Sequence, residues 1–330
     1  MQFTMRRLFG ADNNLLQLAL LTLMIFALMT ALAPDKFLRP YNLLSITYVA
    51  PELGLLSIAM MVTMLSGGID LSVIGIANLS GILAGIFYHA YAGARGPELT
   101  AMAPLSVLGG ILIALATGIL GGAINGVLIA RLRITPILAT IGSGQIFTGA
   151  ALVLTGGPAI VGYPDGWGFI GNGAVFGIAM PLLVFLLLAG FVALLLTRTA
   201  FGVNLALIGT NPKAAVFAGL RLVRTVFFSY VLSGTLASVA GVILSGRTNA
   251  AKSDYGVSYL LQAVLIAVLG GSNPAGGRGS VAGIIMALLA LMLLSSGMQL
   301  LRFSNFMVDL VWGAFLLSSI ALNALRTRVK

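Results

Sequence analysis

Residues 15–33 of the chain read LLQLALLTLMIFALMTALA, a run of 19 residues that contains no charged side chain. An α-helix needs about 20 consecutive apolar residues to cross the hydrocarbon core of a bilayer. Arg6 and Arg7 precede the run, as in a signal peptide. The run is longer than the apolar part of a signal peptide, however, and shows no small-residue cleavage pattern. We therefore expect a retained membrane-spanning helix at residues 15–33.

The composition extends this expectation to the whole chain. Hydrophobic residues make up 59% of the 330 residues and charged residues only 8%, whereas a soluble domain carries about 25% charged residues. The apolar runs are continuous, unlike the short alternating strands of outer-membrane barrels. Helices also satisfy their own backbone hydrogen bonds in hydrocarbon. The sequence therefore predicts an all-α polytopic membrane protein.

Ten apolar segments are interpreted as membrane helices, and together they leave no room for a separate soluble catalytic domain. We expect a single transmembrane domain over residues 1–330. Its helices are predicted at 15–33, 43–66, 71–91, 104–130, 136–154, 172–196, 226–246, 257–271, 281–300 and 306–324.

Lys and Arg residues concentrate on one side of these helices. With ten helices both chain ends lie on the same side, and 12 of the 18 Lys and Arg residues fall there. Cytoplasmic loops of membrane proteins are enriched in Lys and Arg. We therefore expect an N-terminal segment at 1–14, a loop at 197–225 and a tail at 325–330 in the cytoplasm. Because the cations are scattered over helix ends, the net charge of +10 does not indicate nucleic-acid binding.

The predicted loop contains a short helix with clear boundaries. Residues 198–225 read RTAFGVNLALIGTNPKAAVFAGLRLVRT, with four cations and no acid. Asn211 is a favourable N-cap residue, and Pro212 suits the first helical position because it has no amide hydrogen to leave unpaired. Gly219 can end the helix at its C′ position. A helix this short is marginal alone in water, so we expect other helices or a partner to hold it.

The surface of this short helix is expected to be small and apolar. Ala214, Ala215 and Ala218 would form a small-residue face, with Phe217 as an anchor and Lys213 beside them.

Polar residues inside the apolar segments allow two interpretations. Asp70, within the sequence GGIDLS, is either an N-cap for a helix that starts at Leu71, supported by Ser72, or part of a solute path. Uncharged polar side chains either hydrogen-bond between helices or line a path for a hydrated, neutral solute. The candidates for a path are Asp70, Ser72, Asn78, Asn125 and Gln145.

The sequence offers no chemistry typical of an enzyme. It has no cysteine, one histidine and no cluster with metal-ligand spacing, so we expect no catalytic residue, bound metal or cofactor. The glycine-rich segment GGSNPAGGRGS at 270–280 lacks the Lys-Ser/Thr of a phosphate-binding loop and is predicted to be a tight turn. The pairs Gly67-Gly68 and Gly270-Gly271 each follow an apolar run, which suggests an internal duplication.

Three stretches carry a family resemblance: SGGIDLSVIGIANLSGILAG (66–85), FGVNLALIGTNPKAAVFAGL (201–220) and AVLIAVLGGSNPAGGRGSVAG (263–283). Over nearly its whole length the chain resembles the permease subunits of ribose- and simple-sugar-type ABC importers, within the broader set that includes branched-chain amino acid permeases. The segment NAAKSDYGVSYLLQAVLIAVLGG (249–271) is more similar to permeases of rhamnose-like and autoinducer-2-like systems.

The resemblance implies a permease fold of about ten helices in the bacterial inner membrane and several partners. These are a second permease (identical or a paralogue), two cytoplasmic ATPase domains that use ATP and Mg, and a periplasmic binding protein. The middle stretch resembles the helix that docks on the ATPase, and Val203 departs from the Arg often found there. The expected coupling residues are Gly209, Asn211, Pro212, Lys213, Ala214, Ala215, Phe217 and Gly219.

Two other functions remain open from the residues themselves. An ion-coupled secondary transporter would work without an ATPase and needs a buried coupling carboxylate. A membrane scaffold or enzyme that transports nothing is the second alternative. The expectation that we carry forward is import of a sugar or sugar-like neutral solute, driven by a separate ATPase.

Overall fold

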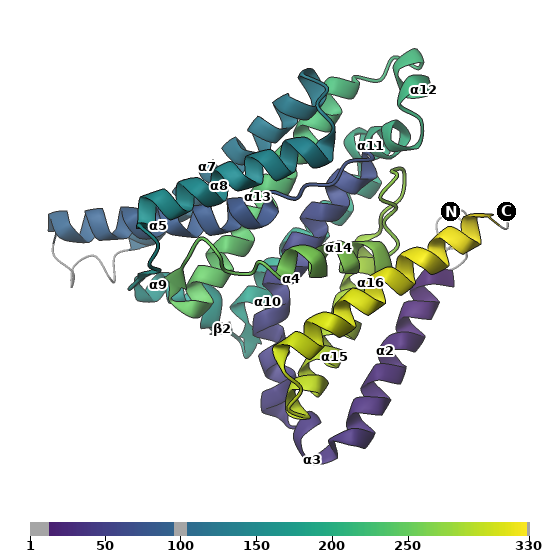
Figure 1. Ribbon diagram of the computed structural model, residues 1–330. Coiled ribbons are helices and arrows are strands. Elements are labelled where there is room, and N and C mark those ends of the chain that lie inside the picture. The colour runs from purple at the N-terminus through teal and green to yellow at the C-terminus, as the bar shows by residue number, and fades with distance from the viewer. Residues whose placement is uncertain (1–12, 96–103, 329–330) are drawn as a thin grey trace.

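The structure is a computed structural model that describes residues 13–95 and 104–328 of the chain (Figure 1). The predicted N-terminal segment 1–14 lies outside it except for residues 13 and 14, and so do the last two residues of the tail. The described chain is almost entirely helical, as predicted. Its helices are α2 (Asn13–Leu32), α3 (Pro34–Phe37), α4 (Pro40–Leu65), α5 (Val73–Arg95), α7 (Pro104–Gly126), the π-helical turn η1 (Val127–Arg131), α8 (Pro136–Thr155), α9 (Asp165–Asn172), α10 (Met180–Arg198), α11 (Ala200–Thr210), α12 (Pro212–Phe217), α13 (Leu222–Thr248), α14 (Tyr259–Leu269), α15 (Val281–Leu300) and α16 (Asn305–Arg328).

Eight helices of the described chain are long and apolar enough to cross a membrane: α2, α4, α5, α7 with η1, α8, α10, α13 and α15. The predicted span at 257–271 is wrong in length. α14 has 11 residues, or roughly 16 Å at 1.5 Å per residue, which is about half of the hydrocarbon thickness. The chain around it is irregular, and such backbone is tolerated in a membrane only where protein surrounds it.

The predicted helix at 172–196 begins too early. α10 starts at Met180, and the preceding residues form α9 and a hairpin of β2 (Ala174–Val175) and β3 (Ile178–Ala179). The turn residues Phe176 and Gly177 both have positive φ, at 51° and 79°. Positive φ at both central residues is typical of a type I′ hairpin turn, which a continuous helix cannot contain. A second strand pair joins β1 (Ile160–Val161) to β4 (Ala250–Ala251).

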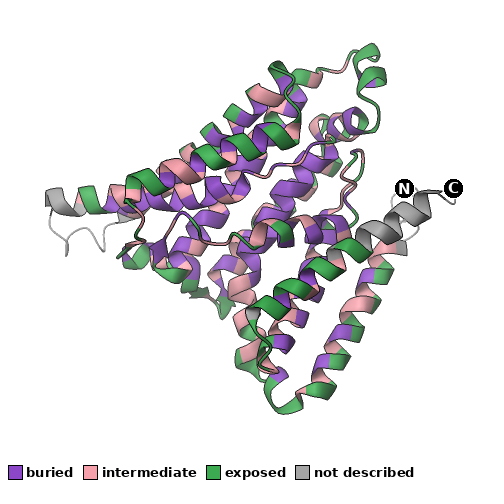
Figure 2. Ribbon diagram, in the orientation of Figure 1, coloured by how far each residue is buried: buried purple, intermediate pink, exposed green. Residues whose placement is uncertain are grey.

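α4 and α13 form the centre of the molecule. α13 contacts α4, α5 and α7, whereas α4 also contacts α10, α14 and α15. Every residue of α4 from Ala50 to Leu65 is buried, so protein surrounds the second half of this helix on all sides. Figure 2 shows the same pattern, with buried residues in the interior and exposed ones along α2, α7 and α8. The outward faces of these helices are apolar, as a lipid-facing surface requires.

Glycines allow α7 and α13 to approach closely. Gly118, Gly122 and Gly126 are spaced four residues apart, so they lie on one face of α7. A Cβ atom at any of them would overlap the backbone or side chains of α13. Small residues at this spacing bring membrane helices into backbone contact, where van der Waals packing holds them together.

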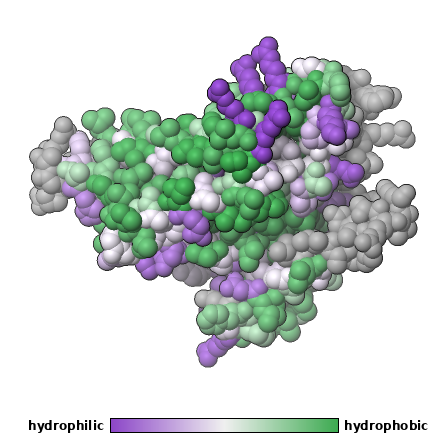
Figure 3. All heavy atoms as spheres, turned by 45° about the horizontal axis from the view of Figure 1, so that its top comes forward, coloured by the Kyte–Doolittle hydropathy of each residue, from purple (hydrophilic) through white to green (hydrophobic). Residues whose placement is uncertain are grey.

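The helices alternate in direction, so their ends gather on two opposite sides. We call the side that carries α12 the α12 end; the start of α2 and the end of α16 also lie there (Figure 1). The hairpin β2–β3 and the segment after α13 lie on the opposite side, which we call the hairpin end. Hydrophilic side chains project from the α12 end, whereas apolar residues cover much of the adjoining flank (Figure 3).

The two Gly pairs end α4 and α14 in the same way. Gly67 and Gly271 have φ of 81° and 94°. In α4 the Gly68 N–H donates to the Thr63 carbonyl oxygen at 3.1 Å, and in α14 the Ser272 N–H donates to the Ala267 carbonyl oxygen at 2.9 Å. Both are Schellman motifs. Gly67 of the first motif is therefore equivalent to Gly271 of the second. The sequence had suggested Gly270, which lies one position earlier.

Candidate functional site at the α12 end

The segment that the sequence predicted as a loop is mostly helical. Residues 200–210 form α11, α12 follows, and the last residues belong to α13. Asn211 is the N-cap of α12, as predicted: its side-chain oxygen accepts a hydrogen bond from the Ala214 N–H at 3.0 Å. Pro212 is the first helical residue, and Gly219 with φ of 79° ends the helix. Local chemistry therefore sets both ends of α12.

α12 has an inner and an outer face. Ala215 is only 4% exposed, and its cluster contains Ile208 of α11 with Val226 and Tyr230 of α13. The expected exposed face therefore does not include Ala215, since this residue attaches α12 to the helices beneath it. Val216 and Phe217 project outward, and Phe217 is 93% exposed. The other predicted coupling residues on the outer side are Asn211, Pro212, Lys213, Ala214 and Gly219, all exposed.

Gly209 lies beneath this surface and joins α11 to the ends of two other helices. A Cβ atom at residue 209 would overlap the Leu65 carbonyl oxygen at the end of α4 and would lie 2.6 Å from the Gly277 nitrogen. The same Leu65 oxygen accepts a hydrogen bond from the Gly277 N–H at 3.0 Å. The glycine-rich segment 270–280 forms a turn, as predicted, and the structure adds that this turn packs against α4 and α11.

A buried polar network lies one layer deeper. The Asp70 carboxylate accepts hydrogen bonds from the Ser72 N–H (3.1 Å), the Ser72 hydroxyl (2.6 Å) and the Ser233 hydroxyl of α13 (2.8 Å). Asn125 of α7 donates to the Ser72 oxygen at 2.7 Å, and its own oxygen accepts from Ser143 of α8. The network joins the start of α5 to three other helices.

Asp70 is not the N-cap that the sequence suggested. α5 begins at Val73, and the carbonyl oxygen of Ser72 accepts the first helical hydrogen bond, from Ile76. Asp70, Ser72 and Asn125 are all fully buried, and their polar groups are bonded to one another and to neighbouring serines. This arrangement is typical of polar groups that hydrogen-bond between helices.

The other two candidate path residues lie apart from this network. The Asn78 amide donates to the carbonyl oxygens of Ser253 and Tyr255, at 3.0 Å and 2.9 Å. It thereby holds the irregular segment after β4. Gln145 lies on the exposed face of α8. The structure therefore brings together three of the five candidates.

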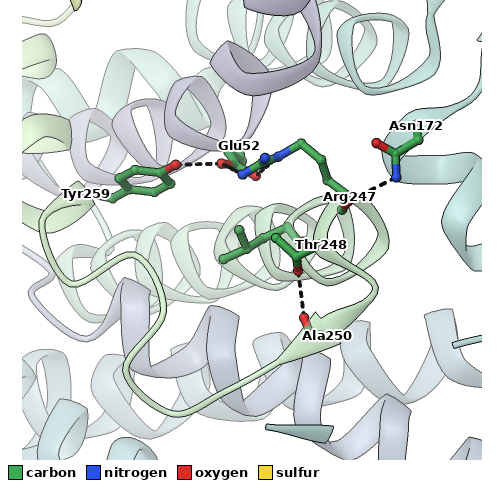
Figure 4. Close-up of polar contacts among 7 residues, drawn as sticks. Glu52, Asn172, Arg247, Thr248, Ala250 and Tyr259 are labelled. Carbon is green, nitrogen blue, oxygen red and sulfur yellow. Dashed lines mark hydrogen bonds and ion pairs between the residues drawn. The ribbon is translucent and has the colours of Figure 1, made fainter. Parts of the chain in front are cut away.

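A buried ion pair that was not predicted from the sequence lies near the middle of α4. The Arg247 guanidinium donates to the Glu52 carboxylate at 2.8 Å and 3.3 Å, and the Tyr259 hydroxyl donates to the same carboxylate at 2.8 Å (Figure 4). Glu52 is 1% exposed. Asn172 of α9 donates to the Arg247 carbonyl oxygen at 3.1 Å. The available signal was an acid within the predicted span 43–66, since such acids are rare in membrane helices and need a partner.

No group of three His, Cys, Asp or Glu residues that could hold a metal ion occurs among the described residues. The buried acids are instead occupied by Arg, Tyr and Ser donors.

Comparisons with known proteins identify a family and several relatives of this chain. A family model described as branched-chain amino acid transport system / permease component matches residues 42–320. The ribose import permease protein RbsC of Bacillus subtilis is 33% identical over 305 residues, which cover 92% of this chain and 91% of that protein. The autoinducer 2 import system permease protein LsrD of Photorhabdus luminescens is 31% identical over 318 residues, which cover 94% and 90%. No solved structure matches the chain.

Proposed function

The chain belongs to the branched-chain amino acid transport system / permease component family, and from this premise we propose how it works as the permease subunit of an ABC importer. It forms the membrane path for a neutral polar solute that a periplasmic binding protein delivers. A separate ATPase supplies the energy. The chain itself binds no nucleotide, because ATP and Mg belong to the ATPase.

The observation that carries this proposal is the exposed apolar surface of α12. Val216 and Phe217 are 55% and 93% exposed, on a short helix that projects from the end of the molecule (Figure 1). Lys213, Arg221 and Arg224 are exposed around them. An apolar anchor within a charged rim is typical of a protein-binding surface. The proposed partner at this surface is the ATPase subunit, with Phe217 as the anchor.

The remaining parts of the assembly follow from this placement. If α12 faces the ATPase, the α12 end lies in the cytoplasm together with both ends of the chain, in the bacterial inner membrane. The binding protein then docks at the hairpin end. A second permease, identical or a paralogue, completes a path between two copies, with one ATPase domain for each.

The proposed solute is a sugar or sugar-like molecule. The two relatives are named for the import of ribose and of autoinducer 2. Their identities to this chain are nearly equal, so the proposal extends to the class of neutral, hydroxyl-rich solutes rather than to one of them.

The test reconstitutes the chain in proteoliposomes with its ATPase and binding protein and measures ATP-dependent sugar uptake. Phe217→Asp places a charge at the centre of the docking surface, and we expect loss of ATPase co-purification and at least a 10-fold drop in uptake. The control is Phe191→Asn on the outward face of α10, where Phe191 is 55% exposed; ATPase co-purification should survive. Retention of the ATPase by Phe217→Asp would contradict the docking role.

An ion-coupled secondary transporter is the alternative. It would need a buried carboxylate that is free to exchange an ion, whereas Glu52 and Asp70 are each held by two or more donor groups. Uptake by the permease alone, without ATP and driven by an ion gradient, would favour this alternative.

A further inference from the structure

A cavity of about 450 Å³ opens between α4, α14, α15 and α16. Its lining residues lie in the first part of α4, α14 and α16 and the last part of α15, which are the portions farthest from α12. The volume falls within the range of about 300–1,000 Å³ that is usual for small-molecule sites. At about 30 Å³ per water molecule it corresponds to roughly 15 waters, enough for one monosaccharide and several waters.

Gln262 is one of the polar residues that line this cavity. Its side chain lines the cavity and is 9% exposed, yet it forms no hydrogen bond with another described residue. A carboxamide offers two donors and one acceptor. The Gln262 amide therefore has its full hydrogen-bonding capacity available for a molecule in the cavity.

Three other polar lining residues also have donors or acceptors that are free to bind a solute. The Ser295 oxygen accepts a hydrogen bond from the Trp312 indole N–H at 3.0 Å, which leaves the Ser295 hydroxyl hydrogen free to donate. The Ser296 hydroxyl donates to Asn42 at 2.8 Å, which leaves its oxygen free to accept. The Asp309 carboxylate adds acceptors that have no hydrogen bond to the described residues.

The charge of the lining discriminates between solute classes. The cavity has one acid, Asp309, and no Lys, Arg or His among its described lining residues. An amino acid would bring an ammonium group that Asp309 could pair and a carboxylate that finds no cation among these residues, so its carboxylate would stay unpaired. A sugar brings hydroxyl groups that both donate and accept, and an apolar ring face that suits the aromatic rings of Trp312 and Tyr259.

Resting on the function proposed above, we propose that this cavity is a solute subsite of the permease, that it takes a neutral monosaccharide, and that it rejects amino acids. Gln262 binds the solute hydroxyls, with Ser295, Ser296 and Asp309 around it.

The cavity is also connected to the docking surface by two helices. α4 and α14 each contribute lining residues near their start. Both helices end at the glycine motifs next to the α12 end. There Gly209 of α11 packs against the last residue of α4, Leu65, and against the turn that follows α14. A displacement of α12 and α11 therefore acts directly on two helices that form the cavity.

The chain contains no cysteine, which allows a direct test in the complete importer. Gln262→Cys places a thiol in the cavity, and Ala263→Cys places one at a fully buried neighbour on the same helix (0% exposed). Both variants are treated with a charged, membrane-impermeant methanethiosulfonate, with and without a panel of D-ribose, D-xylose, L-rhamnose and D-galactose. L-leucine serves as the amino acid probe.

We expect modification of Gln262→Cys to be at least 10-fold faster than that of Ala263→Cys. A sugar that the importer transports should slow the modification at least threefold, whereas L-leucine should not. No modification, no protection by a transported sugar, or protection by L-leucine alone would each overturn the subsite. If the importer with the original permease sequence takes up no solute when ATP is supplied, the proposed function itself would be overturned.

Discussion

The Arg247 Nη2 atom lies 2.8 Å from the Glu52 Oε1 atom and joins the last turn of α13 to the middle of α4. These are the two central helices of the molecule, and the residues are 195 positions apart in sequence. Tyr259 at the start of α14 donates to the same carboxylate and also lines the solute cavity. The ion pair therefore holds together three helices around the proposed subsite.

Removing one partner of this pair should destabilise the protein strongly. Glu52→Gln leaves the Arg247 guanidinium without its counter-ion. Breaking a buried pair costs about 3–5 kcal/mol. We expect about 2–3 kcal/mol, since 24% of the Arg247 side chain is exposed and solvent partly compensates. Unfolding in detergent, followed by circular dichroism, measures the change.

The double variant Glu52→Leu with Arg247→Met is the control for this prediction. Replacing both charges by apolar groups of similar size should recover most of the lost stability. A double variant as unstable as the sum of the two single variants would show that the two residues act independently.

The contact between Gly209 and Leu65 should not tolerate a side chain. Gly209→Ala forces the α11 backbone away from the end of α4, because the new Cβ atom meets a backbone oxygen. We expect at least a 10-fold loss of uptake while the ATPase still co-purifies, since α12 itself is unchanged. Gly190→Ala is the matched control: no atom of the described part of the chain lies within 4 Å of a Cβ atom placed there, and a helical Gly→Ala change should be neutral or stabilise by up to about 1 kcal/mol. Normal uptake by Gly209→Ala would disprove this coupling contact.

The Asp70 network should contribute mainly to stability. Ser233→Ala removes the donor to one oxygen of a fully buried carboxylate, which should cost about 1–3 kcal/mol. In the control Ser238→Ala the lost hydroxyl bonds only to the Thr235 carbonyl oxygen of its own helix, so we expect a smaller loss. Thermal unfolding of the two variants in parallel tests this. Equal melting temperatures, together with a raised KM for uptake in Ser233→Ala alone, would assign Asp70 to the solute path.

A substitution in the turn of the β2–β3 hairpin should increase the stability of the hairpin. Phe176 is fully exposed with φ of 51°, in the left-handed region that bulky residues rarely adopt. Asn-Gly is the preferred pair for a type I′ turn, so Phe176→Asn should stabilise the hairpin by about 1 kcal/mol. Phe176→Val should do the opposite, because a β-branched residue fits this conformation poorly. Hydrogen exchange at the hairpin amides would reveal both effects, and faster exchange in Phe176→Asn would refute the argument.

Much of the fold could be predicted because the bilayer imposes a simple rule. A segment without charges that is as long as the hydrocarbon core becomes a helix, and so the prediction at 281–300 matches α15. The ends of α12 could also be predicted, since capping by Asn211 and Gly219 depends only on nearby backbone groups. The predicted span at 257–271 was too long although the sequence carried the signal, since AKSDYGVS precedes the apolar run of α14 and GGSNPAGGRGS follows it.

The candidate site was predictable in part. The exposed helix with Phe217 could be anticipated, whereas the inward orientation of Ala215 depends on α11 and α13 beneath it. Asp70 attracted attention as an acid near an apolar helix, but its partner Ser233 lies 163 positions away.

By itself, the sequence determined the membrane environment, most helices and the local boundaries of α12, because each of these depends on composition or on neighbours within a few residues. Tertiary structure alone decided that Arg247 neutralises Glu52, that Gly209 meets Leu65, and that Gln262 faces a cavity without a hydrogen-bond partner among the described residues. These relationships join residues that are far apart along the chain, and only the packing of α4 between α13 and α14 brings them together.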